Sequence, residues 1–216
     1  MTDVVIAGIG QIPVGEHYTL DLRSMGVQAL THALRDSGNL KPEALYIGNM
    51  LASSLSHQSN LGALFTDYGH LEGIESYTAE AGGASGAAAL RLGILAILSG
   101  YANTVSVLGV EKWSDLIRSE AEALISQELD YDYESIPGLT STAQAGLIMT
   151  RYLYENNLAP DALGAFAILA HANGINNPNA LFKFPLAPQS YAGPSKLSDP
   201  LSIYDGATYA DGAAAL

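Results

Sequence analysis

A run of small residues, Glu80–Gly86, with an apolar segment after it up to Gly100, constrains the fold more than any other part of the sequence. A short β-prone segment, Ser76–Ala79, precedes this run. The segment that follows has almost no polar side, and a helix without a polar face is normally buried. Its glycines and alanines allow other backbones to approach closely. The sequence therefore predicts a strand, a tight turn that we call the elbow (residues 80–86), and a buried helix.

The start of this helix is also the first candidate site. The first turn of a helix has backbone N–H groups without intrahelical partners, and these groups favour a bound or developing negative charge. The elbow brings such a helix end directly behind a strand. The sequence therefore predicts that the elbow faces a ligand or a reacting group.

Strand-like and helix-like segments alternate along the chain. Continuous apolar runs predict buried strands, and apolar residues at helical spacing predict helices. The predicted strands are Val4–Gly10, Ala44–Leu51, Ser76–Ala79, Thr104–Val110 and Tyr209–Leu216, and the predicted helices include Leu22–Asp36 and Asn60–Tyr68. Helices between buried strands imply crossover connections. We expect an α/β fold with a mixed, mostly parallel five-stranded sheet and a buried central helix.

One alternative for the first strand is a dinucleotide-binding loop. Gly8-Ile9-Gly10 begins such a fingerprint, but Pro13 stands where its third glycine belongs. No helix opens directly afterwards, as that motif requires. A plain strand end is the preferred interpretation.

The composition limits the partners that this chain can have. Only 14% of the 216 residues are charged and 48% are apolar, which leaves little charge to cover a whole surface. We expect one face to be covered by a partner or by a further segment. The net charge of −13, with nine Lys and Arg, argues against nucleic-acid binding, which needs clustered cations. No polybasic segment for membrane binding is present either.

The residue types exclude several kinds of chemistry. The chain has no cysteine, which excludes disulfides, cysteine zinc sites and thiol catalysis. The five histidines show no metal-ligand spacing, so we expect no metal site. The apolar run Leu90–Leu98 is too short to span a bilayer, and Met1–Gly10 lacks the features of a signal peptide. The expected localisation is cytoplasmic.

The character of the chain changes after Trp113. Residues 119–135 are acidic, which is typical of a solvated loop or helix face, with an acidic docking segment as the alternative. Helices are predicted over Thr142–Asn156 and Asp161–Asn173, and a proline-rich stretch then runs to Pro200. We expect residues 1–113 and 204–216 to form one α/β domain and residues 114–203 to be a helical insertion.

These motifs together resemble the thiolase superfamily, and most closely its sterol-carrier-protein-type branch. The family's nucleophile elbow reads Glu-Ala-Ala/Gly-Cys-Ala-Ser-Gly before an alanine-rich helix. This chain matches it at Glu80, Ala81, Ala84, Ser85 and Gly86 but has Gly83 where the family has its nucleophilic cysteine. Later family motifs recur in order as His171, Asn177-Pro178-Asn179-Ala180, Ser198-Asp199-Pro200-Leu201 and Asp211-Gly212-Ala213-Ala214.

The resemblance covers the N-terminal half of a thiolase. It implies a second half of the same fold, which supplies the polarising and histidine groups and the acid/base cysteine. Because the elbow helix packs between the two halves in the family, we expect this chain to be a truncated coding region or one half of a split enzyme. The implied partners are acyl-CoA, a complementary C-terminal half or a second copy in a homodimer.

Three functions follow from the resemblance. The first is an acetyl-CoA acetyltransferase-like protein of lipid metabolism that acts on or binds acyl-CoA thioesters, with thiolate chemistry lost at Gly83. The second is a thiolase-like retro-aldolase, which cleaves a C–C bond beside a CoA thioester and works with an OB-fold and zinc-ribbon partner. The third is a scaffold subunit without activity. CoA is expected as a substrate or ligand, and no bound cofactor is implied.

The candidate site residues come from the same resemblance. Gly83 holds the nucleophile position and offers only its backbone N–H, which can still act as an oxyanion donor. Ser85 is more simply a capping residue than a substitute nucleophile. Ser85, Arg151, Lys183 and His171 are candidates for substrate binding, with a structural hydrogen-bonding role preferred for His171. Glu80 is expected to hydrogen-bond the backbone of the elbow.

Overall fold

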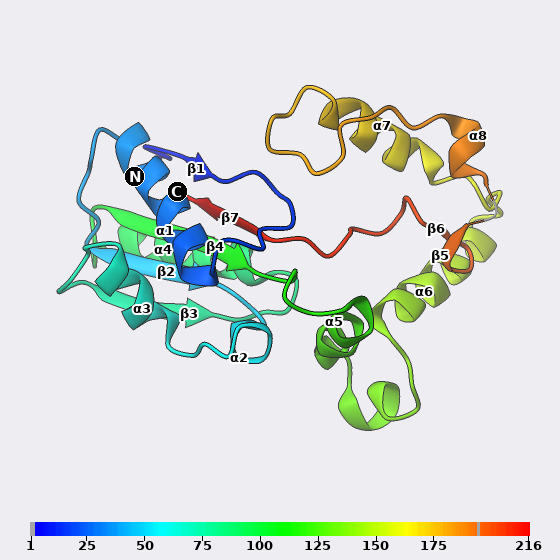
Figure 1. Ribbon diagram of the computed structural model, residues 1–216, viewed down its shortest axis with the longest axis horizontal. Coiled ribbons are helices and arrows are strands. Elements are labelled where there is room, and N and C mark those ends of the chain that lie inside the picture. Colours follow the sequence, from blue (N-terminus) through cyan, green and yellow to red (C-terminus); the bar gives the residue numbers. More distant parts are fainter. Residues whose placement is uncertain (1–2, 194) are drawn as a thin grey trace. The chain divides into compact units, whose positions relative to one another are not determined.

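The computed structural model describes residues 3–193 and 195–216 and divides into two compact units (Figure 1). The first unit contains the residues up to Ile117 together with Ala210–Leu216, and the second contains Arg118–Tyr209. These boundaries lie a few residues later than the predicted ones at 113/114 and 203/204. Each unit has its own elements and is described separately.

Within the described residues, the first unit is built on a five-stranded sheet of order β1-β7-β4-β2-β3. The strands are β1 (Gly10–Gln11), β2 (Ala44–Gly48), β3 (Glu75–Ala79), β4 (Val105–Glu111) and β7 (Gly212–Ala215). β2 pairs in parallel with β3 and β4, whereas β7 is antiparallel to both β4 and β1. β1 to β4 thus share one direction and β7 opposes them, which gives the mixed, mostly parallel sheet expected from helical crossovers.

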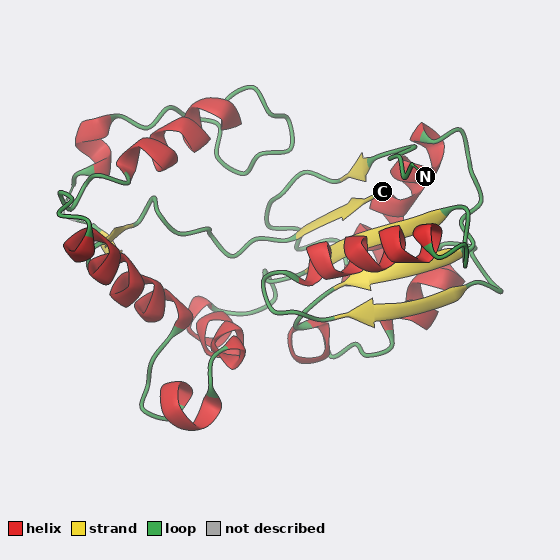
Figure 2. Cartoon of the chain, turned by 180° about the vertical axis from the view of Figure 1, so that it is seen from behind, coloured by secondary structure: helices red, strands yellow, loops and turns green. Residues whose placement is uncertain are grey.

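Helices cover both faces of this sheet. α1 (Leu22–Asp36) and α3 (Leu61–Tyr68) lie on one face and α4 (Ser85–Leu98) on the other, while the short α2 (Ala52–Leu55) follows β2 (Figures 1 and 2). α1 begins where predicted because Asp21 caps it: the Asp21 carboxylate accepts a hydrogen bond of 2.7 Å from the Ser24 amide. Such a cap satisfies one of the free N–H groups of the first turn.

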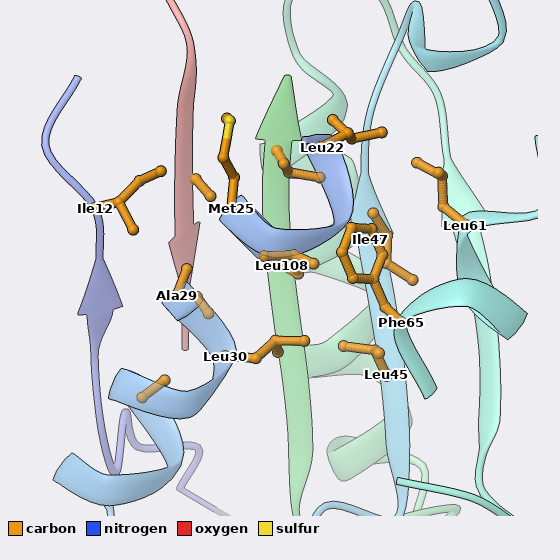
Figure 3. Packing of buried hydrophobic residues seen from close by; sticks show 14 of the residues in the cluster. Ile12, Leu22, Met25, Ala29, Leu30, Leu45, Ile47, Leu61, Phe65 and Leu108 are labelled. Atoms are coloured by element: carbon orange, nitrogen blue, oxygen red, sulfur yellow. The ribbon is translucent and has the colours of Figure 1, made fainter. Parts of the chain in front are cut away.

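The two layers of the core form on opposite faces of the sheet because side chains alternate along each strand. Successive side chains of a strand point to opposite faces, so Leu45 and Ile47 of β2 pack against α1 and α3, and Tyr46 packs on the α4 side. Figure 3 shows Met25, Phe65 and their neighbours filling the first of these layers. Phe65 is fully buried, and burial of such a side chain stabilises the fold by about 1.5–3 kcal/mol.

The prediction of a doubly buried strand over Val4–Gly10 is wrong. Only Gly10–Gln11 forms β1, paired with Ala215 and Ala214 of β7. The side chains of Val5, Ile6 and Ile9 are 76%, 66% and 64% exposed. The physical reason is that β7 flanks only the end of this apolar run, so the residues before it have no neighbouring strand to bury them.

The other predicted elements of the first unit are present with small shifts at their ends. Leu22–Asp36 is helical over its whole predicted length, and the Ala44–Leu51 strand ends at Gly48, where the chain turns into α2. The last strand occupies Gly212–Ala215 rather than the whole of Tyr209–Leu216.

The second unit is mainly helical. It contains α5 (Arg118–Ile125), a 3₁₀ turn η1 (Ser126–Glu128), a π turn η2 (Tyr131–Ser135), α6 (Ser141–Glu155), α7 (Gly164–Gly174), α8 (Pro188–Tyr191) and the hairpin β5 (Lys196–Ser198) and β6 (Leu201–Ser202). α7 starts at Gly164 rather than at Asp161 because residues 159–163 form turns, with the Gly164 amide donating to the Asp161 carbonyl. A small core gathers Ala167, Leu186 and Tyr191.

The acidic stretch forms α5, η1 and η2 of this unit. Tyr131 and Tyr133 are 72% and 84% exposed there. The Glu122 carboxylate accepts a hydrogen bond of 2.5 Å from the Tyr209 hydroxyl, which ties the two ends of the unit together. Over the described ranges, none of the helices combines the length and apolar character that crossing a membrane would take.

Candidate functional site

The elbow lies at the carboxyl end of β3 and leads directly into α4. Gly82 has a backbone φ of +56°, a left-handed conformation that glycine adopts without steric cost. The Ser85 hydroxyl donates to the Gly82 carbonyl at 2.7 Å and accepts from the Ala81 amide at 3.0 Å. The Glu80 carboxylate accepts from the Gly82 amide at 2.6 Å. These bonds hold the elbow in one shape from within.

Small residues let α4 lie close against the sheet. Ser85, Ala89, Gly93 and Ala96 form its buried stripe. A Cβ atom on Gly93 would lie 3.1 Å from Val107 Cγ2, so the helix and strand are in direct contact there. The opposite side of α4 exposes Ile94, Leu95 and Leu98 by 37%, 43% and 51%. The predicted burial of this helix therefore holds for its stripe against the sheet, whereas its opposite side is apolar and exposed.

Gly48, the last residue of β2, sets the position of the elbow. A Cβ atom at this glycine would lie 2.6 Å from the Gly86 Cα atom and 2.7 Å from the Ser85 carbonyl oxygen. Both contacts are to backbone atoms, which cannot rotate away as a side chain can. The end of β2 and the start of α4 are therefore packed as closely as two backbones allow.

We expect Gly48→Ala to lower the free energy of unfolding by about 1–3 kcal/mol, the usual cost of overpacking. Gly86→Ala is the matched control, because a Cβ atom at Gly86 would meet nothing within 4 Å. Alanine in place of glycine inside a helix stabilises by about 0.5–1 kcal/mol. Urea denaturation of both variants measures the difference, and equal stabilities would contradict the close contact.

Gly83 occupies an open position in the elbow. A Cβ atom there would meet nothing within 4 Å, and the backbone of Gly83 is not in the left-handed region. A side chain at this position would therefore be sterically accepted. Ser85, by contrast, is buried and its hydroxyl is engaged both as donor and as acceptor. Its geometry is that of a residue that stabilises the turn.

Sequence reasoning missed a polar cluster at the ends of β2 and β4. The Asn49 amide group donates to the Val110 carbonyl and to the Glu111 carboxylate, each at 2.8 Å. Glu111 also accepts from the amides of Met50 and Leu51 at 3.2 Å. Burial raises the pKa of Glu111, although these hydrogen bonds favour its ionised form. Polar residues directly after two buried parallel strands were the available signal.

Asp211 is the most enclosed charged group of the first unit, at 0% exposure. Its carboxylate accepts hydrogen bonds from the amides of Trp113, Ser114 and His17 at 2.6, 2.8 and 2.7 Å. The Lys112 ammonium lies 3.7 Å away. Burial would raise the pKa of Asp211, but the hydrogen bonds from Ser114, His17 and Trp113 outweigh it and hold this pKa below its usual value.

The other predicted site residues belong to the second unit. Arg151 forms an exposed ion pair of 2.6 Å with Glu155 along α6. The Lys183 ammonium donates to the Pro178 carbonyl at 2.7 Å. His171 lies on α7, with its Nδ1 atom 3.1 Å from the Phe184 carbonyl oxygen.

His171 is at the centre of an aromatic cluster. Its ring stacks on Phe182 with centroids 5.9 Å apart, and it also contacts the rings of Phe184 and Tyr204 at 4.8 and 5.8 Å. Lys183 lies between the two phenylalanines in sequence, so it and His171 belong to one region of this unit. Within residues 3–193 and 195–216, no three His, Asp or Glu side chains are grouped to hold a metal ion.

Comparisons with known proteins agree on the family. The family model described as thiolase, N-terminal domain, matches residues 4–197. The acetyl-CoA acetyltransferases of Methanothermobacter thermautotrophicus and Methanocaldococcus jannaschii are 32% and 33% identical to this chain over 218 aligned residues. A solved structure described as the Ltp2-ChsH2(DUF35) aldolase has the same fold, with a TM-score of 0.77, 20% identity, and coverage of 97% of this chain and 53% of that chain.

The chain spans about half the length of these relatives. The alignments cover 100% of this chain but only 56% and 55% of the two acetyltransferases. The family model, in contrast, matches most of the chain, including the elbow and α4. This confirms the resemblance derived from the motifs, and the chain belongs to the thiolase family.

Proposed function

We propose that this chain is the N-terminal half of a thiolase-family protein that binds an acyl-CoA thioester at the elbow without forming an acyl-enzyme. The observation that carries the proposal is the elbow itself. The hydrogen bonds of Ser85 within the elbow and the close packing of the elbow on Gly48 are both present. Gly83, at the sterically open position in the middle of the elbow, has no side chain. The elbow that would hold a nucleophile is therefore present, but the nucleophilic side chain is absent.

The chemistry left at this position is electrostatic. Thiolate transfer of an acyl group requires a cysteine, and the chain has none. The Ser85 hydroxyl is not a substitute, because it is committed to the backbone of the elbow. The Gly83 amide, just before the N-cap residue of α4, is suited to donate to the thioester oxygen as negative charge develops on it.

A retro-aldol cleavage is the second candidate, because it needs a polarised thioester but no thiolate. A base removes the proton of a β-hydroxyl group, the Cα–Cβ bond breaks to form a carbonyl, and its electron pair moves into the thioester as an enolate. Protonation at Cα then gives the shortened acyl-CoA. The absence of a side chain at Gly83 and the fold shared with an aldolase support this candidate.

We assign CoA contacts to the second unit and the reacting groups to the complementary half. Lys183 and His171 lie in one region with exposed Phe182 and Phe184, which offers a cation for phosphate and flat rings for stacking. Arg151 is a further cation of this unit. A complementary C-terminal half or a second copy completes the elbow, and the retro-aldolase candidate adds an OB-fold and zinc-ribbon partner. The scaffold candidate needs the same partners but no turnover.

The test uses the native assembly and two assays. Acetoacetyl-CoA with CoA measures acyl transfer, and a β-hydroxyacyl-CoA measures the release of an aldehyde or ketone. The proposal expects saturable acyl-CoA binding and no acyl transfer, with carbonyl release if the aldolase candidate holds. Efficient acyl transfer by the native protein would contradict the proposal. Binding without turnover in either assay would favour the scaffold candidate.

A further inference from the structure

Glu75 lies at the start of β3, the edge strand of the sheet (Figure 1), between three tyrosines. Its Oε1 atom accepts a hydrogen bond of 2.8 Å from the Tyr46 hydroxyl, and its Oε2 atom accepts one of 2.9 Å from the Tyr101 hydroxyl. The rings of Tyr46 and Tyr77 are in contact, with centroids 5.0 Å apart. We call these four residues the Glu75 cluster. They include no residue of the elbow, so the cluster is separate from the proposed acyl-CoA site.

The register of β2 and β3 brings three of these residues together. Ala44 of β2 pairs with Glu75, and Tyr46 pairs with Tyr77. Side chains two residues apart on a strand share a face of the sheet. Glu75 and Tyr77 therefore lie on one face, and it is the face on which Tyr46 packs beside α4.

The end of α4 fixes the fourth residue, Tyr101. Gly100 has a backbone φ of +76°, and the Tyr101 amide donates to the Ala96 carbonyl at 3.0 Å. A left-handed glycine with such a bond is a common way to end a helix. Since the C-terminal end of a helix carries a partial negative charge, the Glu75 cluster adjoins a helix end that favours a cation.

The Glu75 cluster carries a carboxylate without a cationic partner in the described part of the chain. None of the ion pairs within residues 3–193 and 195–216 includes Glu75. Its two tyrosine partners remain protonated donors: burial and the bond to Glu75 raise the pKa of Tyr46, and the bond to Glu75 raises the pKa of Tyr101. A second carboxylate, Glu43, lies at the same end of β2 and accepts from the Asn103 amide at 2.7 Å.

A structural role explains only part of this arrangement. The two hydrogen bonds brace the residue after α4 against β3, and they would do so equally in a buried cluster. Glu75 is exposed, however, and Tyr77 and Tyr101 are 44% and 62% exposed. Each carboxylate oxygen has a further lone pair, and the faces of exposed aromatic rings attract cations. Accessible carboxylate oxygens beside accessible ring faces suit an organic cation.

We propose that the Glu75 cluster binds a guanidinium group. A guanidinium is planar and weakly hydrated, so it can lie against a tyrosine ring and still donate hydrogen bonds to a carboxylate. An ammonium group holds its water more strongly and has no flat face to place on a ring. The inference goes beyond the proposed function, and it fails or holds separately from acyl-CoA binding.

The test titrates the native protein with methylguanidinium, kept far below denaturing concentrations, and follows the tyrosine ring resonances by NMR. N-methylurea, which has a similar shape and no charge, is the control ligand. We expect saturable shifts of the Tyr77 and Tyr101 rings with methylguanidinium and none with N-methylurea. Equal shifts with the two ligands, or equal shifts of tyrosines outside the cluster such as the exposed Tyr18, would overturn the proposal.

Two variants and a matched control assign the binding to these side chains. Glu75→Gln removes the charge and should weaken binding at least about tenfold, the effect of a lost charge-assisted hydrogen bond. Tyr77→Leu leaves both hydrogen bonds of Glu75 in place and should weaken binding about two- to fivefold, the effect of one exposed cation–π contact. Glu16→Gln, which removes a carboxylate hydrogen-bonded to Tyr18 outside the cluster, should leave binding unchanged. Unchanged binding in Glu75→Gln, or equal losses in Glu75→Gln and Glu16→Gln, would contradict the proposal.

A last comparison identifies the source of the guanidinium group, which is either a small molecule or an arginine of another protein chain. Free arginine represents the first source, and Nα-acetylarginine amide imitates an arginine within a chain. Tighter binding of the acetylated amide assigns the site to a protein arginine, and tighter binding of free arginine assigns it to a small molecule. Binding of neither compound would overturn the proposal.

Discussion

Replacement of Asp211 by alanine is expected to lower the free energy of unfolding by about 3–5 kcal/mol, the cost of removing one partner of a buried ion pair. The carboxylate accepts hydrogen bonds from the backbone amides of His17, Trp113 and Ser114. It thereby links the loop at His17 and the end of β4 to the residue just before β7. Without it these amides lose their acceptor, and the buried Lys112 ammonium loses the carboxylate 3.7 Å away while keeping its hydrogen bonds to Ser114 and Asp115. Urea denaturation followed by circular dichroism measures the loss.

Asp115 provides the matched control. It pairs with the same Lys112 ammonium at 2.9 Å, but its own side chain is 53% exposed. Because the Asp115 carboxylate is half exposed to water and the Lys112 ammonium keeps Asp211 nearby and the Ser114 hydroxyl and His17 carbonyl as acceptors, Asp115→Ala should cost less than Asp211→Ala. Equal losses for the two variants would show that the backbone amides do not depend on Asp211.

The lowered pKa of Asp211 leads to a prediction of how the free energy of unfolding changes with pH. Because the folded-state pKa of Asp211 lies below its usual value, its contribution is complete above the unfolded pKa of about 3.9 and is lost as the pH falls through the folded pKa. Asp211→Asn, which does not titrate, should have a flatter stability profile below about pH 4. A profile in this range identical to that of the native protein would contradict the assignment.

Gly83→Cys is expected to create the single reactive thiol of this chain. The position is sterically open, so the free energy of unfolding should change by less than about 1 kcal/mol. Because the residue lies just before Ala84, the N-cap of α4, the partial positive charge of the helix N-terminus should lower the thiol pKa below its usual value of about 8.5. The rate of alkylation against pH gives this pKa directly.

The control for this measurement is Ala207→Cys. Ala207 is exposed in an irregular segment without a helix start, so its thiol should titrate near about 8.5. Since the native chain has no cysteine, each variant reports on one site only. Equal pKa values for the two thiols would mean that the start of α4 does not act on position 83.

Much of the fold of the first unit was predictable because its helices and turns follow from local sequence patterns. The Asp21 cap and the apolar spacing of α1 define that helix in the sequence, and the small residues around Gly93 predict the close contact of α4 with the sheet. The prediction of a strand over Val4–Gly10 was wrong for a reason that a local sequence pattern does not show. Burial of an apolar run depends on which strand lies beside it, and β7 reaches only Gly10 and Gln11.

The candidate site was predictable in position but not in detail. The elbow and the open position at Gly83 followed from the motif. The clusters around Asp211 and Glu111 join residues far apart in sequence, such as His17 and Asp211 or Asn49 and Glu111. These hydrogen bonds depend on the order of the strands in the sheet, which was not predicted from the sequence. Ser85 was expected to cap the helix and instead stabilises the turn before it.

The central claim is that the elbow keeps the frame of a thiolase site around a missing nucleophile. Intact-mass measurement after incubation with acetyl-CoA, on the native assembly and on its Gly83→Cys form, tests it most directly. We expect no covalent adduct on the native protein and one acetyl group on the variant, removable by hydroxylamine. An acetyl adduct on the native chain, at Ser85 or elsewhere, or no adduct on the variant, would contradict the claim.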